Sequence, residues 1–309
     1  MIIAAYGAGE TLAAAIESAL AQTEPPHEII VVDDGSPDGQ AAIAALYSAD
    51  IVYVSREKNG GEATAKDTGA SVATGDFVVT LDADDTWHER RIEAIADQLA
   101  GRPDLDIVTT DAMIVLDGRR IRRYYGGPTG ATWAETDQRY AILERNFIFS
   151  HAAVRRSRWI EVGGLETGRR DHAADWPFWV KLILTGSRAG FINEPLANYT
   201  LTTGSLSASA TTRARTREVA MATAVSVVTA TANERFVAER NLADARRQLY
   251  RLGALRKLWR YEQSRAQFVH IALNNDYRKR HRGEALLAAV FPQAVRRRMG
   301  TDPDIFERS

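Results

Sequence analysis

Cysteine is absent from the 309 residues of this chain, which excludes disulfides, thiolate nucleophiles and cysteine metal ligands. Long apolar runs are absent as well, and none approaches the roughly 18 to 20 residues that a membrane-spanning helix needs. The first residues, Met1 to Tyr6, have neither the length nor the basic start of a secretory signal. These absences predict a cytoplasmic protein.

The charges are unevenly distributed along the chain, although its net charge is only −1. Residues 1–212 hold 19 Lys and Arg against 30 Asp and Glu, a net of −11. Residues 213–300 hold 19 against 7, a net of +12. An acidic front and a basic back predict two parts with different partners, which we place at residues 1–210 and 211–309.

Short apolar runs alternate with helical patterns through the first 112 residues. The runs typical of strands are residues 2–5, 28–32, 51–54, 77–81 and 106–110, and helical spacing covers 11–21, 40–47, 62–73 and 89–99. This alternation predicts an α/β fold with a mostly parallel, doubly wound sheet. Ligands of such sheets bind beyond the carboxyl ends of the strands, so the residues after each run are the first candidates for a site.

The second half of the chain is less regular. Residues 113–125 predict a hairpin around Asp117-Gly118, residues 174–184 predict a helix, and residues 195–201 predict a last extended segment. From about Thr211 onward the pattern is helical without strand-like runs.

Three carboxylates follow the predicted strand 77–81 directly, in Asp82-Ala83-Asp84-Asp85. Crowding them is unfavourable unless a cation or hydrogen-bond donors compensate their charges. Carboxylate oxygens suit Mg²⁺ or Mn²⁺, either of which also binds diphosphate oxygens and stabilises a diphosphate leaving group. The alternative is a capping cluster for the helix near Glu89, but three acids exceed what a cap requires.

Two further turns follow predicted strands. A carboxylate of Asp33-Asp34-Gly35-Ser36 can accept hydrogen bonds from a base or a ribose, or it can close an Asx-type turn. Gly7-Ala8-Gly9 resembles a dinucleotide fingerprint, but Leu12 stands where that fingerprint needs glycine or alanine. This turn defines an alternative function, an oxidoreductase with an NAD(P) cofactor.

Residues 59–66 combine glycines with a helix start. In Asn59-Gly60-Gly61, the glycines let the backbone approach a phosphate, and the following helix, which carries Lys66, favours anions at its start. A plain loop between strand and helix is the equal alternative.

Asp175 lies in an aromatic segment that runs from His172 to Trp179. A carboxylate among aromatic side chains is partly desolvated, which raises its pKa and suits a general base. Pro177 is compatible with a first helical turn, so Asp175 is expected at the helix start, where an ordinary cap is the alternative. His172 is a second candidate base.

Together these segments resemble the family 2 glycosyltransferases, inverting enzymes with the GT-A fold. The matching residues are Ile2 to Tyr6, Ser18 to Thr23, Glu28 to Ser36, Asn59 to Gly61, Gly75 to Asp85, Val162 to Leu165, Asp175-Trp176, Asn193 to Leu196, Tyr199 and Gly204 to Ser207. The resemblance covers roughly residues 1–210, with a nucleotide-sugar half of about 1–112 and an acceptor half of about 113–210. It implies that a sugar moves from a nucleotide diphosphate donor to a hydroxyl of a glycan or lipid-linked acceptor, in cell-surface polysaccharide or glycolipid synthesis.

The resemblance also implies roles for individual residues. Asp34 would recognise the base, uracil of a UDP-sugar, and Asp175 would deprotonate the acceptor in a single displacement. Asp84 would be the principal ligand of Mn²⁺ or Mg²⁺, with Asp82 as the second. Further donor contacts would be Ala4, Ala5, Tyr6, Asp33, Asn59, Gly60, Gly61, Lys66 and Ala83, and candidates for another donor or acceptor contact are Asp85, His172, Trp176 and Trp179. Lys66-Asp67 replaces an Arg-Asn pair that is frequent in the family. A non-catalytic glycan-binding module remains a third function.

The basic part predicts an amphipathic helix over residues 246–260, with leucines at helical spacing and six basic residues. Such a helix suits a peripheral contact with an anionic membrane, or it packs as a helical subdomain or homo-oligomer contact with a solvated basic face. Nucleic acid is not expected as a partner, because the front is acidic and no nucleic-acid motif is present.

Overall fold

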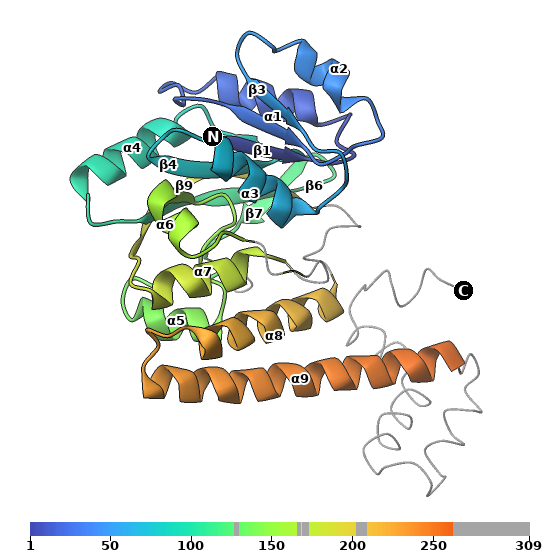
Figure 1. Cartoon of the computed structure of the whole chain (residues 1–309), viewed down its shortest axis with the longest axis vertical. Helices are drawn as coiled ribbons and strands as arrows, with labels where there is room; N and C mark the ends of the chain where they lie inside the picture. The colour runs from blue at the N-terminus through green and yellow to red at the C-terminus, as the bar shows by residue number, and fades with distance from the viewer. Residues whose placement is uncertain (127–129, 166–167, 169–172, 202–208, 262–309) are drawn as a thin grey trace, which may run out of the picture.

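The computed structural model describes residues 1–126, 130–165, 168, 173–201 and 209–261 (Figure 1). Its strands are β1 (Ile2–Ala5), β2 (Ile30–Asp33), β3 (Val52–Ser55), β4 (Phe77–Asp82), β5 (Thr86–Trp87), β6 (Ile107–Leu116), β7 (Arg119–Arg123), β8 (Ala153–Arg155) and β9 (Ala189–Leu201). Its helices are α1 (Leu12–Leu20), α2 (Gln40–Ala45), α3 (Glu62–Val72), α4 (Arg91–Gly101), α5 (Gln138–Glu144), α6 (Arg156–Glu161), α7 (Asp175–Leu184), α8 (Ala210–Ser226) and α9 (Ala232–Tyr261). The predicted α/β architecture is confirmed.

The strands form one sheet in the order β3-β2-β1-β4-β8-β6-β9-β5, with β7 paired to β6. The first four strands in this order are mutually parallel, as the alternation predicts. Their carboxyl ends therefore meet at one edge, which gathers the residues after β1, β2 and β4 in one place.

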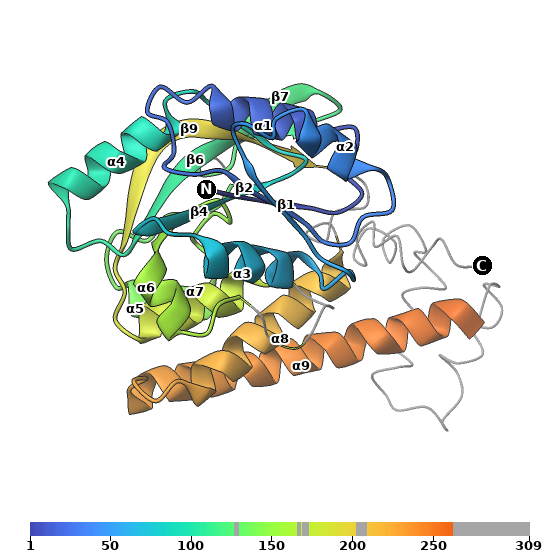
Figure 2. The ribbon, with the colours of Figure 1, turned by 45° about the horizontal axis from the view of Figure 1, so that its top comes forward.

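Helices cover both faces of this parallel part (Figure 2). Successive residues of β1 point to opposite faces, so Ile2 packs in the core on the side of α3 and α7, and Ile3 packs in the core on the side of α1 and α4. Both side chains are fully buried. Burial on two faces explains why the strands appear as continuous apolar runs.

The sequence did not predict β8, a short strand between β4 and β6. It pairs antiparallel with both neighbours through Val154. Only three residues form it, too few to show an alternating pattern. The hairpin around Asp117-Gly118 is confirmed: β6 and β7 pair antiparallel, and these two residues have φ of 49° and 72°.

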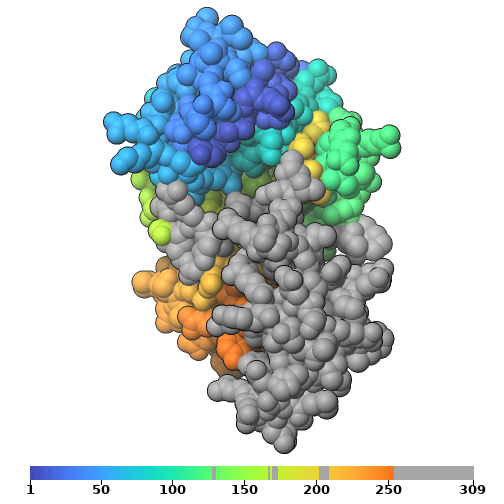
Figure 3. Space-filling view, turned by 90° about the vertical axis from the view of Figure 1, so that its right-hand side faces the viewer, coloured from blue at the N-terminus to red at the C-terminus, as the bar shows by residue number. Residues whose placement is uncertain are grey.

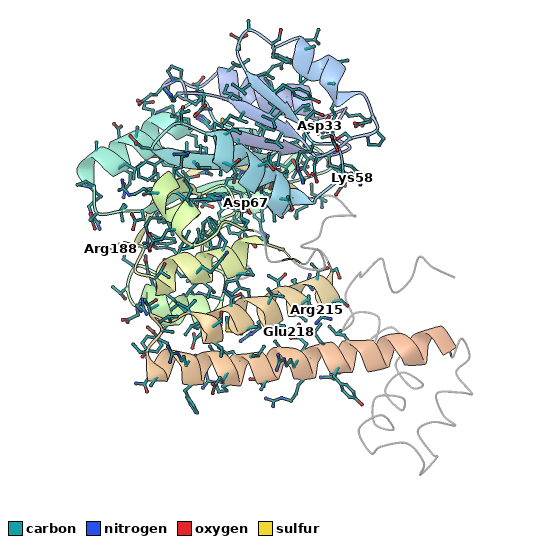
Figure 4. The ribbon with its side chains drawn as sticks, in the orientation of Figure 1. Asp33, Lys58, Asp67, Arg188, Arg215 and Glu218 are labelled. Atoms are coloured by element: carbon teal, nitrogen blue, oxygen red, sulfur yellow. The ribbon has the colours of Figure 1, made fainter. Side chains whose placement is uncertain are left out.

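Helices α8 and α9 form an antiparallel pair beneath α5 and α7 (Figure 1). In the space-filling view of Figure 3, the orange atoms of this pair lie at the opposite end of the molecule from the blue atoms of the first strands. Ala220, Met221 and Ala238 of this pair belong to the same hydrophobic core as α7. Figure 4 shows Arg215 and Glu218 on α8, where Glu218 pairs with Arg215 at 2.5 Å and with Arg246 of α9 at 3.5 Å. Of the helices described here, none is long and apolar enough to cross a membrane.

Candidate active site

A cavity of about 1500 Å³ opens where β1, β2 and β4 end. Residues after these strands line one side, namely Ala4, Ala5, Tyr6, Asp34, Asp82, Ala83 and Asp84, together with Asn59 and Gly61 of the loop before α3. The opposite side contains Tyr124, Asn146, Phe149, Asp175, Trp176 and Tyr199. The predicted donor residues and the predicted base thus share one cavity, although up to 171 positions separate them in the sequence.

Asp82 ends β4 and is neutralised by protein groups. Lys66 Nζ lies 2.6 Å from Asp82 Oδ1 and 2.5 Å from Glu62 Oε1, and the lysine side chain is only 3 % exposed. Burial by itself would raise the pKa of Asp82, but the charge of Lys66 and the hydrogen bond from His151 outweigh it and lower that pKa. Lys66 therefore holds Asp82 ionised through this ion pair. The sequence had instead suggested that Lys66 contacts the donor.

Asp85 is held inside the protein instead of facing the cavity. Its side chain is 1 % exposed, Oδ1 accepts a hydrogen bond of 2.6 Å from the Thr200 amide, and Oδ2 lies 3.1 Å from His151 Nε2. Burial raises the pKa of Asp85 despite these contacts. Asp85 thereby links the end of β4 to β9, and its predicted contact with donor or acceptor stays a prediction.

No pattern in the sequence indicated His151, which is fully buried between Asp82 and Asp85. Its Nε2 lies 3.3 Å from Asp82 Oδ2, and its Nδ1 accepts the indole N–H of Trp87 at 3.3 Å. Because Trp87 can only donate, Nδ1 is an acceptor and the proton of the neutral ring lies on Nε2. Burial opposes the charged form of His151, but the two carboxylates prevail and raise its pKa.

Asp84 is the carboxylate of this cluster that faces the cavity without a side-chain partner among the described residues. Burial, followed by the charges of Asp85 and Asp82, raises its pKa to about 6. An unpaired carboxylate destabilised by its neighbours is suited to a divalent cation. The cluster does not cap α4, because that helix follows Arg90 and has no side-chain cap.

The ligand atoms of Asp82, Asp85 and His151 lie within 4.8 Å of one another, so these residues are an alternative metal set. We favour Asp84 with Asp82, because these two residues line the cavity and Asp85 and His151 do not. The donor set consists of oxygens, which fits Mg²⁺ or Mn²⁺.

Asp34 anchors the glycine loop before α3. Its carboxylate accepts the amides of Gly60 at 2.9 Å and Gly61 at 2.6 Å, and pairs with Arg56. Asp33 accepts hydrogen bonds from the Tyr53 hydroxyl at 2.6 Å and from the Ser36 amide at 2.9 Å. The bond from Ser36 closes the Asx-type turn that the sequence offered as the alternative to a nucleotide contact. Asp34 borders the cavity and Asp33 does not, and their contacts with a base or ribose stay predictions.

Asp175 is the first residue of α7, as predicted, and it does not cap the helix. Its Oδ2 accepts a hydrogen bond of 2.8 Å from the side-chain amide of Asn146, and its Oδ1 accepts one of 2.8 Å from the backbone amide of Trp176. Burial is the largest cause that raises its pKa to about 6. A carboxylate with this pKa in a cavity is suited to accept a proton near neutral pH.

Trp176 and Trp179, the aromatic residues that the sequence indicated near Asp175, lie in different surroundings. Trp179 is 2 % exposed and packs against Phe178 in the core, whereas Trp176 borders the cavity and donates to the Ile142 carbonyl at 2.8 Å. The cavity is also lined by Tyr124, Phe149 and Tyr199, whose ring centroids are 4.9 to 6.2 Å apart. His172, the other candidate base, lies outside the described residues.

This chain is similar in sequence to known glycosyltransferases. The sequence model of glycosyl transferase family 2 matches residues 1–163. The putative teichuronic acid biosynthesis glycosyltransferase TuaG of Bacillus subtilis is 27 % identical over 214 residues, which cover 68 % of this chain and 81 % of TuaG. The amylovoran biosynthesis glycosyltransferase AmsB of Erwinia amylovora is 27 % identical over 215 residues, 66 % of this chain and 69 % of AmsB.

Solved structures share the fold over a longer stretch. S. aureus TarS 1–349 in complex with UDP-GlcNAc superposes with a TM-score of 0.63 at 17 % identity. The superposition covers 96 % of this chain and 81 % of the TarS chain. The mannosyltransferase PcManGT of Pyrobaculum calidifontis, in complex with GDP-Man and Mn²⁺, superposes with a TM-score of 0.59 at 19 % identity, over 94 % and 86 %. These likenesses confirm the GT-A fold, and the family match covers more than half of the sequence, so the chain belongs to glycosyltransferase family 2.

Proposed function

We propose that this protein is an inverting glycosyltransferase that moves a sugar from a UDP-sugar to a hydroxyl of a glycan or lipid-linked acceptor, in the synthesis of a cell-surface polysaccharide. The family match supports sugar transfer. The names of two relatives, TuaG and AmsB, refer to polysaccharide synthesis, and TarS was solved with UDP-GlcNAc. An NAD(P) oxidoreductase is set aside, because the chain belongs to a glycosyltransferase family.

The donor would bind along the ends of β1, β2 and β4. Ala4, Ala5 and Tyr6 would border the base, and Asp84 with Asp82 would hold Mn²⁺ or Mg²⁺, a view supported by the complex of PcManGT with GDP-Man and Mn²⁺. The cation would neutralise charge on the diphosphate as it leaves. Lys66 would keep Asp82 ionised, and the cation would share this carboxylate with the lysine ammonium group.

The acceptor would bind beside Asp175. Its hydroxyl would give its proton to Asp175, and the oxygen would form a bond to the anomeric carbon as the bond from that carbon to the diphosphate breaks. The electron pair would leave with the diphosphate, and attack from the opposite side would invert the configuration. Asn146 would orient the carboxylate by donating a hydrogen bond to Oδ2, while Oδ1 accepts the Trp176 amide of α7.

The observation that carries this proposal is the shared cavity, which places an unpaired Asp84 and a half-buried Asp175 with a raised pKa on its lining. The test is a thermal-shift panel of UDP-, GDP- and dTDP-sugars, NAD(H) and NADP(H), each with and without Mn²⁺. A ligand of the native state raises its melting temperature. We expect a UDP-sugar to stabilise the protein only with Mn²⁺.

Two variants make the panel specific to the site. Asp84→Ala should lose the Mn²⁺-dependent shift and keep the melting temperature of the ligand-free protein, and unchanged donor affinity in this variant would refute the metal site. Asp175→Asn should bind the donor and fail to transfer the sugar. Transfer at the wild-type rate by Asp175→Asn would remove Asp175 as the base, and donor binding without any transfer by the wild type would favour a non-catalytic glycan-binding module.

A further inference from the structure

Strand β7 is unusually basic, because four of its five residues are arginines: Arg119, Arg120, Arg122 and Arg123. Two of these pair with neighbouring residues. Arg120 donates to Asn198 at 3.1 Å, and Arg123 pairs with the buried Asp111 at 2.5 Å and with the Asn193 carbonyl at 3.0 Å. These contacts tie β7 to the sheet, and the carboxylate of Asp111 compensates the charge of Arg123.

Arg122 is different, because it is exposed and borders the active-site cavity. The strand register places it opposite Ile114 of β6, which in turn lies opposite Tyr199 of β9, and all three side chains line the cavity. Tyr124, the residue that follows β7, also lines the cavity. The sheet therefore fixes the direction in which Arg122 points.

The guanidinium of Arg122 has no carboxylate partner among the described residues. Its printed hydrogen bond goes to the backbone carbonyl of Arg123 at 3.0 Å. The acidic residues of the cavity lining come mostly from the strand ends and loops of the donor side, whereas Arg122 comes from the opposite side, where Asp175 lies. A positive charge is thus left uncompensated on the side of the cavity that holds the predicted base.

Arg122 and Asp175 are also close enough to act on a common group, the Tyr124 hydroxyl. Burial is the largest cause that raises the pKa of Tyr124, the charge of Asp175 raises it further, and the charge of Arg122 lowers it. Tyr124 therefore lies within electrostatic range of both side chains. An acceptor with its hydroxyl at Asp175 would therefore lie on the side of the cavity that carries Arg122.

We propose that Arg122 binds an anionic group of the acceptor, a phosphate or a carboxylate close to the hydroxyl that receives the sugar. The acceptor is then an acidic glycan or a phosphate-containing chain, and Arg122 sets its specificity. A guanidinium suits both anions, because its planar donors match two oxygens of either group. The inference rests on the proposed transfer reaction and adds the chemical class of the acceptor.

Three small probes test the proposal: D-glucuronate, D-glucose 6-phosphate and neutral D-glucose. Their binding to the full chain is measured by ligand-detected NMR at low ionic strength, since salt screens an exposed charge. UDP and Mn²⁺ are kept saturating, so that the donor side is filled and the probes report on the acceptor side. We expect both anions to bind at least about tenfold more tightly than glucose.

The variants are Arg122→Gln, Arg122→Lys and the matched control Arg119→Gln, an exposed arginine of the same strand that does not line the cavity. Arg122→Gln should weaken the binding of both anions about tenfold or more, and Arg122→Lys should retain part of the affinity. Arg119→Gln should bind both anions like the wild type. UDP affinity should be the same in all four proteins.

Three results would overturn the proposal: glucose binding as tightly as the anions, anion affinity unchanged in Arg122→Gln, or failure of both anions to bind the wild type. Weaker UDP binding in Arg122→Gln would instead make this arginine a donor contact and would overturn it too. A wild type that binds no UDP with Mn²⁺ would refute the proposed function itself, a result separate from these.

Discussion

At the scale of single residues, Lys66 shows how the fold changes the role that a sequence suggests. Its position after a glycine loop predicted a contact with the donor. In the structure the ammonium group is buried between Asp82 and Glu62. Two carboxylates outweigh the unfavourable effect of burial and raise the pKa of Lys66. The residue thus acts on the proposed metal site through Asp82.

We predict that Lys66→Met lowers the free energy of unfolding by about 3 kcal/mol or more, because it leaves Asp82 without its compensating charge. Urea unfolding would measure the loss at pH 7, where Asp82 is ionised. Lys58→Met, at an exposed lysine in the preceding loop, is the control and should change stability by less than about 0.5 kcal/mol. Equal stability of the two variants would contradict the role assigned to Lys66.

Asp175 allows a prediction of pH dependence. A base must be ionised, and burial raises the pKa of Asp175 to about 6, so the transfer rate should fall as pH drops below about 6 and level off above it. Asp175→Asn should reduce the rate by about 10²- to 10⁴-fold. The measurement is kcat/KM against pH with saturating Mn²⁺, which keeps Asp84 ionised. A rate that stays constant from pH 5 to 8 would show that another group is the base.

At the scale of elements, α3 lies very close to the sheet. An added Cβ at Gly69 would meet Ile2 Cγ2 of β1 at 2.6 Å, within the core between the helix and the strand. Close approach here brings α3, and with it Lys66 and the glycine loop, to the edge where β2 and β4 end. The position of the proposed donor site therefore depends on a glycine in the middle of a helix.

Gly69→Ala should destabilise the protein by about 1 to 3 kcal/mol, because overpacking outweighs the better helix propensity of alanine. The matched control is Gly253→Ala in α9, where an added Cβ meets nothing within 4 Å. That change should stabilise by about 0.5 to 1 kcal/mol. Thermal unfolding of both variants would measure the difference in sign, and a stabilising Gly69→Ala would contradict the packing described here.

At the scale of the whole molecule, the helical region after residue 210 is bound closely to the front of the chain. Arg139 of α5 donates to the Ile183 and Leu184 carbonyls at the end of α7 and pairs with Glu234 of α9 at 2.6 Å. Thr212 and Thr216 of α8 also border the cavity. A domain boundary near residue 210 stays a prediction, as do a membrane or homo-oligomer contact of the basic helices.

We predict that a chain of residues 1–261 folds and that a chain of residues 1–209 does not. The shorter chain would expose the core that α7 shares with Ala220, Met221 and Ala238, and exposed apolar surface of this kind promotes aggregation. Soluble yield and a cooperative thermal transition are the measurements. A soluble, cooperatively folded 1–209 chain would instead support an independent domain that ends near residue 210.

Much of the fold followed from local patterns. Ile2 to Ala5 and Phe77 to Leu81 are strands in the structure as predicted, because a strand covered on both faces needs consecutive apolar residues. The position of Asp175 at a helix start followed from Pro177 in the same way. β8 could not be predicted, because three residues carry no period and its place depends on the two strands it joins.

The sequence by itself determined the alternation of helices with the parallel strands β1 to β4, the family, and the segments that supply the carboxylates, because each of these is encoded in neighbouring residues. Only the tertiary structure decided which carboxylates are neutralised. His151 lies 69 positions from Asp82, and its ring reaches Asp82 and Asp85 only once β4 and the chain before β8 are packed together. Arg122 and Asp175 likewise line one cavity that exists only in the folded chain, since electrostatic contacts depend on distance in space and leave no local pattern.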